Sequence, residues 1–409
     1  MKNLTHTTDS LRFCDNLGKG VKLVATAHSE KSVNVQSEVP PRSESNWKVP
    51  EVMATIGPTL EKLEDLERAI EAGARWFRLP CGYRQRPHLE NSRAVRSASR
   101  SSGLPVQLLL DLPSSRPRTG TMEELRLAIG DTVLFWDPET EKSAHSNNGT
   151  LHVPLPGLSA LISKLRIKHR MWFCDGRLSF VIDELRDGSV LTRMEKGTIP
   201  LKSSNSIFLP DSPSPFTVMT TQDRSLLESF RQNDVTPDWI ALSLVGSADD
   251  VLCARKEAQQ RLGSTPRVMA KFETEQALEV MDEIISAADG VMVARGDLGL
   301  AVGYIRLPEV QEKLVAAARQ AGKPVIVATQ ALEMFAENGL PQRAELSDLS
   351  LIARQRADAV MLGKETVFSP RPIECIRFAC QMLAHETRRF EKAERQESEQ
   401  ALQRNMVTK

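Results

Sequence analysis

Charged side chains stand at the ends of two neighbouring apolar segments in the second half of the chain. Lys271 and Glu273 close the segment VMAKF at 268–272, and Asp297 follows DGVMVA at 289–294. Lys271 and Glu273 are two residues apart, so in an extended strand both side chains project to the same side. The two carboxylates offer the hard oxygen ligands that Mg²⁺ or Mn²⁺ prefers. A lysine beside a metal-bound oxoacid can stabilise enolate charge or transfer a proton.

Similar residues recur at the ends of other apolar segments. A charged residue at one strand end is usually an ordinary surface residue, whereas one at each of several ends is typical of an active site built from strand termini. Geometry alone leaves both readings open. We expect the two carboxylates to lie together and repel each other without metal, and the backbone at Gly296 and Gly299 to offer amide donors. The further strand-end residues are Arg78, Asp111, Ser243, Thr329, Lys364 and Glu365.

The elements that must position these residues alternate between short apolar runs and helical segments. The runs are apolar on consecutive positions, as expected for strands that are covered on both faces. Eight such units predict an α/β protein with a (β/α)₈ TIM barrel, formed by residues 48–111 and 217–390. The eight runs are VMAT (52–55), RWFRL (75–79), VQLLLD (106–111), WIALS (239–243), VMAKF, DGVMVA, PVIVAT (324–329) and ADAVML (357–362).

Three segments do not follow this alternation of apolar runs and helical segments. Residues 112–216 contain short β patterns separated by turns such as SNNG and RDGS, which predict a small all-β domain inserted after the third barrel strand. Residues 1–47 are polar and Ser-rich and are expected to form a variable extension. Residues 391–409 are expected to form a charged helical tail.

The composition excludes several classes of function. The chain has 409 residues, with 53 basic and 53 acidic side chains. This balance removes the electrostatic argument for nucleic acid or an anionic membrane as the main partner. No apolar run approaches the roughly 18 residues of a spanning helix. The six cysteines form no C-x-x-C pair, so reduced thiols in a cytoplasmic protein are expected.

Long motifs resemble the pyruvate kinase family from about residue 48 to residue 390. They are MAKFETEQALEVMDEIISAADGVMVARGDLGL, GKPVIVATQALEMF, RAELSDLSLIARQRADAVMLGKET and the early VMATIGP. The inserted domain corresponds to the lid of that family, a small β-barrel. No counterpart of the family's C-terminal allosteric domain is expected.

The resemblance implies a role for each residue of the predicted site. Glu273 and Asp297 would bind Mg²⁺ or Mn²⁺, and Lys271 would lie over the phosphoryl and enolate oxygens. The amides of Gly296 and Asp297, together with Thr329, would surround the enolpyruvate carboxylate. The transferring phosphate would contact Arg78, and Ser243 is predicted to contact the substrate.

The monovalent-cation side departs from the family. Where the family reads Arg-Leu-Asn-Phe-Ser-His-Gly, this chain reads RLPCGYR at 78–84. The Asn and Ser ligands for potassium are therefore Pro80 and Gly82, and a neighbouring Thr ligand is Leu112. Only Asp111 survives, so K⁺ is not expected as a cofactor.

The nucleotide side departs as well. An Arg near the ATP phosphates is replaced by Glu61, which would repel them. The His beside the nucleotide is Tyr83, and the lid's Lys and Asn are Asn205 and Phe208. Arg118 persists, so anion binding near the site is retained.

Two residues of the altered loop carry alternative readings. Cys81 is either a small packing residue or a reactive thiol, and packing is the commoner role for a free cysteine. Tyr83 packs, acts as an acid or contacts the substrate, and packing is the commoner role.

Three functions are compatible with this pattern. The first is a divalent-metal-dependent enzyme acting on an enolpyruvate or 2-oxoacid without efficient ATP phosphoryl transfer, such as a decarboxylase or C–C lyase. The second is a pyruvate kinase independent of monovalent cations, in which Lys364, Arg84 or Arg116 replaces the missing charge, as a lysine does in some members of the family. The third is a catalytically silent sensor of a metal–oxoacid complex. A homodimer through the barrel is a further expectation.

Overall fold

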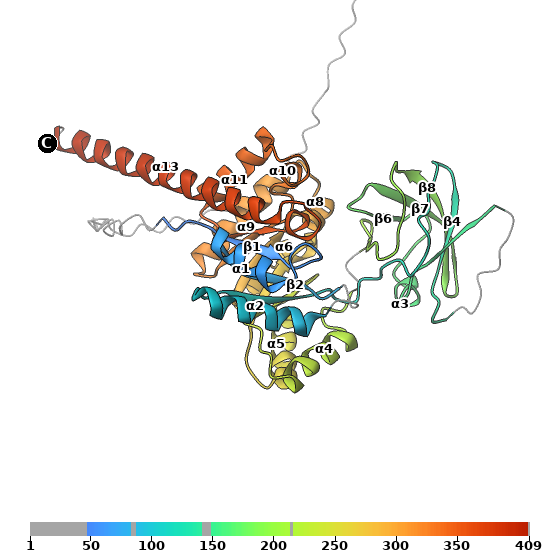
Figure 1. The fold of residues 1–409 in the computed structure, drawn as a ribbon. Coiled ribbons are helices and arrows are strands. Elements are labelled where there is room, and N and C mark those ends of the chain that lie inside the picture. The colour runs from blue at the N-terminus through green and yellow to red at the C-terminus, as the bar shows by residue number, and fades with distance from the viewer. Residues whose placement is uncertain (1–46, 83–86, 141–148, 213–215, 408–409) are drawn as a thin grey trace, which may run out of the picture. The chain divides into compact units, whose positions relative to one another are not determined.

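Eight parallel strands close into a barrel in the computed structural model, which describes residues 47–82, 87–140, 149–212 and 216–407 (Figure 1). Their order around the barrel is β1-β14-β13-β12-β11-β10-β3-β2. This confirms the predicted (β/α)₈ fold. The strands are β1 (Glu51–Thr55), β2 (Ala74–Pro80), β3 (Gln107–Leu112), β10 (Trp239–Leu242), β11 (Arg267–Phe272), β12 (Gly290–Ala294), β13 (Val325–Ala328) and β14 (Ala359–Leu362).

The barrel strands are apolar on consecutive positions because both of their faces are covered. Every residue of β10, β12, β13 and β14 is buried. In β10, Ile240 and Leu242 pack outward under the helices, while Trp239 and Ala241 belong to a separate cluster inside the barrel. Trp76 reaches the same inner cluster from β2, with its ring 5.4 Å from that of Trp239. A strand in this position needs apolar side chains on both faces. It therefore lacks the alternation of apolar and polar residues that is typical of a half-exposed strand.

Helices follow the strands and cover the outside of the barrel (Figure 1). Side-chain caps begin several of them; Thr220, Ser247 and Thr274 accept hydrogen bonds from the backbone amides of Asp223, Asp250 and Ala277. Within the described segments, no helix is long and apolar enough to cross a bilayer. The helices are α1 (Leu63–Ala72), α2 (His88–Ser102), α4 (Thr221–Gln232), α5 (Ala248–Leu262), α6 (Glu275–Glu279), α7 (Met281–Ala287), α8 (Arg295–Val302), α9 (Leu307–Gln320), α10 (Glu333–Asn338), α11 (Arg343–Gln355), α12 (Lys364–Val367) and α13 (Pro372–Val407).

The chain leaves the barrel after β3 and returns before β10, and the segment between forms a second sheet of order β5-β4-β8-β7-β6-β9. This sheet has its own core, in which the rings of Phe135, Phe173 and Phe180 pack together. We call it the lid sheet. Its elements are β4 (Thr132–Trp136), β5 (Leu151–Pro154), the one-turn helix α3 (Ser159–Ile162), β6 (Arg170–Phe173), β7 (Leu178–Arg186), β8 (Ser189–Lys196) and β9 (Ile207–Phe208).

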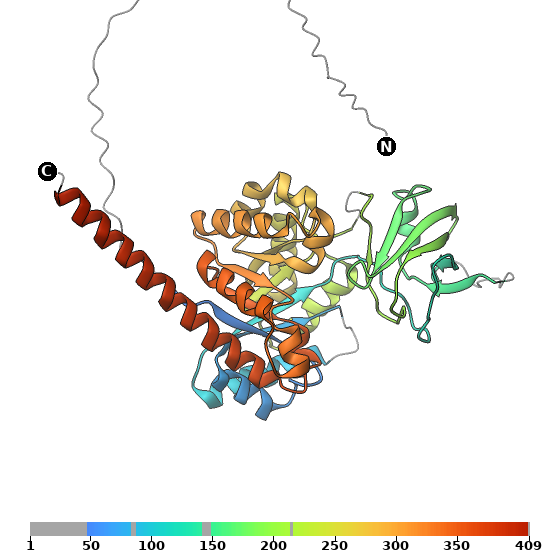
Figure 2. The same cartoon turned by 90° about the horizontal axis from the view of Figure 1, so that it is seen from above.

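Helix α13 runs without a break from Pro372 to Val407, so the predicted boundary at residue 390 lies inside a single helix (Figure 2). The ring of Trp47 stacks on that of Phe390 at 5.9 Å, and the Arg356 guanidinium lies 3.9 Å from the centre of the Trp47 ring. The beginning of the described chain is thereby attached to the middle of α13. Apart from Trp47, the predicted polar extension lies outside the described residues.

Candidate active site

A cavity of about 310 Å³ lies at the carboxyl ends of the barrel strands. Barrel geometry brings these ends together, although the residues come from segments that are far apart in the sequence. Ten of the residues predicted from the sequence line this cavity. They are Arg78, Asp111, Arg118, Ser243, Lys271, Glu273, Gly296, Asp297, Thr329 and Lys364.

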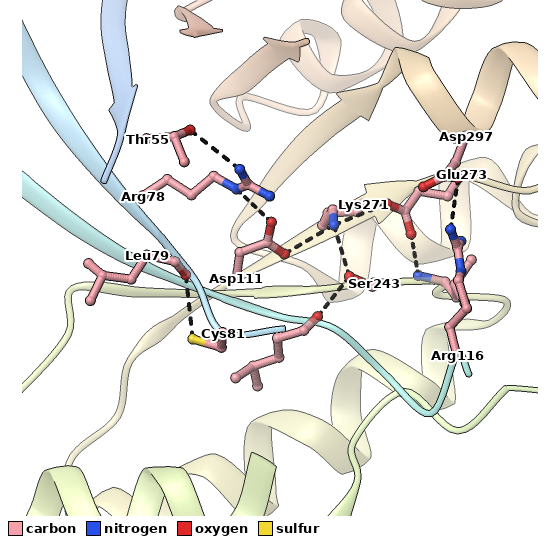
Figure 3. A network of polar contacts seen from close by, with 12 residues as sticks. Thr55, Arg78, Leu79, Cys81, Asp111, Arg116, Ser243, Lys271, Glu273 and Asp297 are labelled. Carbon is pink, nitrogen blue, oxygen red and sulfur yellow. Dashed lines mark hydrogen bonds and ion pairs between the residues drawn. The ribbon is translucent and has the colours of Figure 1, made fainter. Parts of the chain in front are cut away.

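Lys271 on β11 is the centre of a buried polar network (Figure 3). Its Nζ lies 3.0 Å from Asp111 Oδ1 and 3.0 Å from Glu273 Oε1, and it donates to Ser243 Oγ at 2.8 Å. Burial by itself would lower the pKa of Lys271, but the charges of Asp111 and Glu273 outweigh it and the pKa is raised. Lys271 is therefore an ammonium group, suited to stabilising negative charge on a ligand oxygen.

Asp111, at the end of β3, pairs with two cations. Its Oδ2 accepts a hydrogen bond from Arg78 Nε at 2.7 Å, while its Oδ1 contacts Lys271. Burial would raise the pKa of Asp111, but Lys271 and Arg78 together hold it below its usual value. Arg78 also donates to Thr55 Oγ1 at 3.3 Å, which fixes its guanidinium at the cavity wall. Asp111 thus links β3 to its neighbour β2 and to β11, which lies beyond β10 in the barrel.

Glu273 and Asp297 are each paired with a cation, so the expectation that they face each other bare and repel is wrong. Glu273 contacts Lys271 through Oε1, and its Oε2 accepts from the Leu244 amide at 2.7 Å. Asp297 Oδ1 accepts from Arg116 Nη1 at 2.7 Å (Figure 3). Sequence reasoning considered Arg116 only as a substitute for a missing cation. The signal was present in the run DLPSSRPR, where the family has Glu at the position of Arg116.

Helix α8 begins directly at the end of β12, as the predicted alternation of strands and helices implies. Gly296 and Asp297 lie in its first turn, and the first amides of a helix have no acceptor within the helix. These amides belong to residues that line the cavity, so they suit a ligand carboxylate. Arg295 instead pairs with Asp348 at 2.6 Å and donates to the Thr329 carbonyl, which holds the start of α8 in place.

Thr329, at the end of β13, has an unusual backbone and an unused hydroxyl. Its φ of 72° lies in the left-handed region, which is uncommon for a β-branched residue. Its Oγ1 is buried and has no hydrogen-bond partner among the described residues. A Cβ placed on Gly296 would lie 3.8 Å from this oxygen, so the hydroxyl stands beside the start of α8. A buried hydroxyl without a partner, in a cavity wall, is suited to a ligand.

Two predicted candidates lie outside the cavity lining. Glu365 is fully buried and accepts from the amides of Ala331 and Leu332, both at 3.0 Å. Burial raises its pKa, and its contacts brace the β13 and β14 ends. Cys81 is buried and donates to the Leu79 carbonyl at 3.4 Å. Burial, with a contribution from Asp111, raises the pKa of this thiol well above its usual value, so it is neutral and unreactive near pH 7. Tyr83 lies outside the described residues.

The part of the cavity wall next to Asp111 includes residues without polar side chains. Pro80, Gly82 and Pro113 line it and carry no side-chain oxygen, and Leu112 is fully buried in the core. In the lid sheet and its flanking loops, Asn205 Oδ1 accepts from the Lys202 amide at 2.8 Å, and Phe208 stacks on Trp172 with ring centres 6.0 Å apart. Both residues are therefore engaged in local structure.

Two further cations line the cavity. Lys364 lies 3.3 Å from Glu333 and 4.0 Å from Asp175, which belongs to the turn between β6 and β7. Arg118 donates to the Ser204 carbonyl at 3.0 Å. Glu273 and Asp297 have Lys271 and Arg116 as their partners instead.

The side chains fit a divalent metal of the Mg²⁺ type. No group of three or more His, Cys, Asp or Glu side chains in the described ranges is arranged to hold a metal. Mg²⁺ is nevertheless commonly held by one or two carboxylates while water and substrate oxygens complete its shell. Glu273 and Asp297 supply this number, and the unused Thr329 hydroxyl marks the place of a ligand beside them.

Fold and cavity together define a (β/α)₈-barrel protein with a charged site at the carboxyl ends of its strands. The family model described as "Pyruvate kinase, barrel domain" matches residues 47–376. A pyruvate kinase of Methylorubrum extorquens is 34% identical over 330 residues, which are 80% of this chain and 66% of that protein. Pyruvate kinases of Thermotoga maritima and Thermococcus litoralis are 30% and 31% identical, with 80% of this chain and 68% and 67% of theirs covered. The chain belongs to the pyruvate kinase family. It spans about two thirds of the length of these relatives.

Proposed function

We propose that the protein is a divalent-metal-dependent enzyme that acts on an enolpyruvate or 2-oxoacid, with little phosphoryl transfer to or from ATP. One observation carries the proposal. The side of the cavity that holds Lys271, Glu273 and Asp297 keeps its polar groups, whereas Pro80 and Gly82 on the other side carry no side-chain oxygen and leave only Asp111 of the four family ligands there, already paired with Arg78 and Lys271. Phosphoryl transfer depends on cations positioned around the moving charge. The missing side-chain oxygens should therefore impair phosphoryl transfer more than they impair enolate formation.

The retained side chains serve the formation of an enolate. The amides of Gly296 and Asp297 and the Thr329 hydroxyl would orient the substrate carboxylate. Glu273 and Asp297 would hold Mg²⁺ or Mn²⁺, which when bound polarises the 2-oxo group as a Lewis acid. Lys271, held as an ammonium, would stabilise negative charge on the adjacent oxygen. Arg78, fixed by Asp111 and Thr55, would contact a second anionic group of the substrate.

Decarboxylation of a 3-carboxy-2-oxoacid illustrates the chemistry that this half allows. The bond to the departing carboxylate breaks, its electron pair forms the enolate, and carbon dioxide leaves. The enolate then takes up a proton at carbon to give a pyruvate-type product. C–C lyase reactions and proton exchange at a methyl next to the oxo group use the same charge stabilisation.

The experiment compares two reactions in one preparation. The full chain with Mn²⁺ or Mg²⁺ is given oxaloacetate, or pyruvate in deuterated water, and separately phosphoenolpyruvate with ADP. Three lost or altered charged contacts at about 1–3 kcal/mol each would depress ATP formation by at least about a hundredfold relative to enolate turnover. ATP formation at ordinary kinase rates would refute the proposal. Oxalate binding without either activity would favour a sensor.

A pyruvate kinase independent of monovalent cations is the second candidate. The observation in its favour is that two cations absent from the family motifs, Arg116 and Lys364, line the cavity. Either could supply charge near a phosphoryl group. Equal ATP formation in sodium and potassium salts, at ordinary kinase rates, would support this candidate over the first. For both candidates the ligand is a small molecule, and association through the barrel into a homodimer is part of the proposal.

A further inference from the structure

Arg116 occupies an unusual place beside the proposed metal carboxylates. Its side chain is 9% exposed, and its Nη1 lies 2.7 Å from Asp297 Oδ1 (Figure 3). Arg116 and Glu273 also line the same active-site cavity. The guanidinium thus stands at one of the two carboxylates that would hold the metal.

The charges around this point balance without a metal. Asp111 is paired with Lys271 and Arg78, and Glu273 is paired with Lys271. Asp297 has Arg116 as its partner. A divalent ion placed between Glu273 and Asp297 would stand within a few ångström of the guanidinium and would be repelled by it.

The Arg116 side chain has somewhere to withdraw. It lines the active-site cavity and also a neighbouring cavity of about 340 Å³ that includes Phe216 and Leu244. The Phe216 ring centre lies 5.9 Å from the Arg116 guanidinium carbon. Withdrawal would separate the largely buried Arg116 guanidinium from the Asp297 carboxylate. A buried charge without a partner is costly, so another anion has to replace Asp297.

We propose that Arg116 is an internal competitor of the divalent metal, so that Asp297 binds either the guanidinium or the metal. An anionic oxoacid then becomes the new partner of the displaced guanidinium. Metal alone therefore binds weakly, and metal and oxoacid bind cooperatively. This inference rests on the proposed metal site at Glu273 and Asp297.

The test measures binding of Mn²⁺ by its free-ion electron paramagnetic resonance signal, with and without oxalate, so no turnover is needed. The full chain is compared with Arg116→Met, which removes the charge and keeps an apolar side chain of similar length. We expect Arg116→Met to bind Mn²⁺ alone about tenfold more tightly or better, because close ion pairs have couplings of that size. We also expect oxalate to strengthen Mn²⁺ binding less in Arg116→Met than in the unchanged chain.

Two matched variants make the result specific. Lys364→Met removes a cation of the same cavity that pairs with Glu333 and not with the metal carboxylates, and it should change Mn²⁺ affinity by less than about twofold. Arg116→Lys keeps the charge and should remain close to the unchanged chain. An equal gain in Lys364→Met would indicate a general charge effect and overturn the competition.

The remaining outcomes separate this inference from the proposed function. Unchanged Mn²⁺ affinity in Arg116→Met overturns the competition, while loss of Mn²⁺ binding in Glu273→Gln would still support the metal site. Absence of Mn²⁺ binding in every protein, Arg116→Met included, overturns both the metal site and the competition.

Discussion

Two sides of one barrel cavity differ in what their side chains offer. At the ends of β11 and β12, Lys271, Glu273 and Asp297 form paired charges. At the ends of β2 and β3, Pro80 and Pro113 present only carbon to the cavity. The backbone of the second side is nevertheless regular, because β2 and β3 keep their parallel register up to the pair Pro80–Asp111. The side chains at a barrel mouth can therefore differ between its two sides while the strands that carry them keep a regular register.

Leu112 shows what an apolar residue contributes at a position where the family motif has a polar ligand. It takes the place of a ligand in the family motif, and it is fully buried in the outer core cluster. Full burial of a leucine side chain is worth about 1.5–3 kcal/mol relative to exposure. The position now contributes to packing, whereas a polar ligand there would need a partner.

The largest expected effect tests the charged side directly. The double change Glu273→Gln with Asp297→Asn should weaken Mn²⁺-dependent oxalate binding about a thousandfold, since each lost charged contact is worth about 2 kcal/mol or more. Titration calorimetry of oxalate with Mn²⁺ present gives the measurement. Glu275→Gln is the control, because its carboxylate lies two residues further on and pairs with Arg306 on the surface. Unchanged oxalate affinity in the double variant would place the site elsewhere.

A smaller effect concerns Asp111, which connects the two sides. Asp111→Asn leaves Lys271 and Arg78 with one partner fewer, and breaking such a buried pair should lower the free energy of unfolding by about 3 kcal/mol. The folded-state pKa of Asp111 is lowered. Asp111 therefore makes its full contribution to the free energy of unfolding above its pKa in the unfolded chain, which is about 3.9. This contribution disappears as the pH falls through the lower pKa of the folded state.

Denaturant unfolding at several pH values checks this prediction. The difference between the unchanged chain and Asp111→Asn should be constant from about pH 8 to 5 and should shrink below about pH 4. Asp183→Asn in the lid sheet, a partly exposed carboxylate, serves as the control. A difference that is absent at pH 7, or that grows in acid, would contradict the pairing of Asp111.

The smallest expected effect tests the side that includes Pro80, Gly82 and Leu112. Replacing sodium by potassium at fixed ionic strength should change any measured turnover by less than about twofold, because screening is the same for both salts. Pro80, Gly82 and Leu112 provide no side-chain oxygen that would distinguish the two ions. A tenfold stimulation by potassium would show that backbone carbonyls or water complete a site on this side.

The barrel could be predicted from the sequence because its strands are covered on both faces. The run WIALS at 239–243, for example, predicts β10 at Trp239–Leu242 to within one residue. Barrel topology then brings the strand ends together, so Lys271 and Asp111 were expected in one site although they are 160 residues apart. The existence of strands and the side on which they end follow from local patterns.

The partner of each charged side chain could not be predicted in the same way, nor could a helix that forms despite a glycine-rich sequence. The pair Arg116–Asp297 joins residues 181 positions apart, and no local pattern specifies which carboxylate a given arginine reaches. The two glycines of ARGDLGL have low helix propensity, but α8 forms because tertiary packing outweighs it. A Cβ at Gly299 would come within 3.0 Å of the Tyr304 ring, so this glycine allows close packing instead of bending.

The insertion between β3 and β10 also bears on the order in which the molecule folds. The contacts that complete the site close long loops, since Ser243 bonds to the Leu112 carbonyl across 131 residues and Lys271 reaches Asp111 across 160. Closing such loops is entropically costly and slow, although the cost grows only with the logarithm of loop length. The lid sheet has its own aromatic core, so it can collapse first and shorten the effective loop. We therefore expect the charged network around Lys271 to be among the last parts to form, after the barrel has closed.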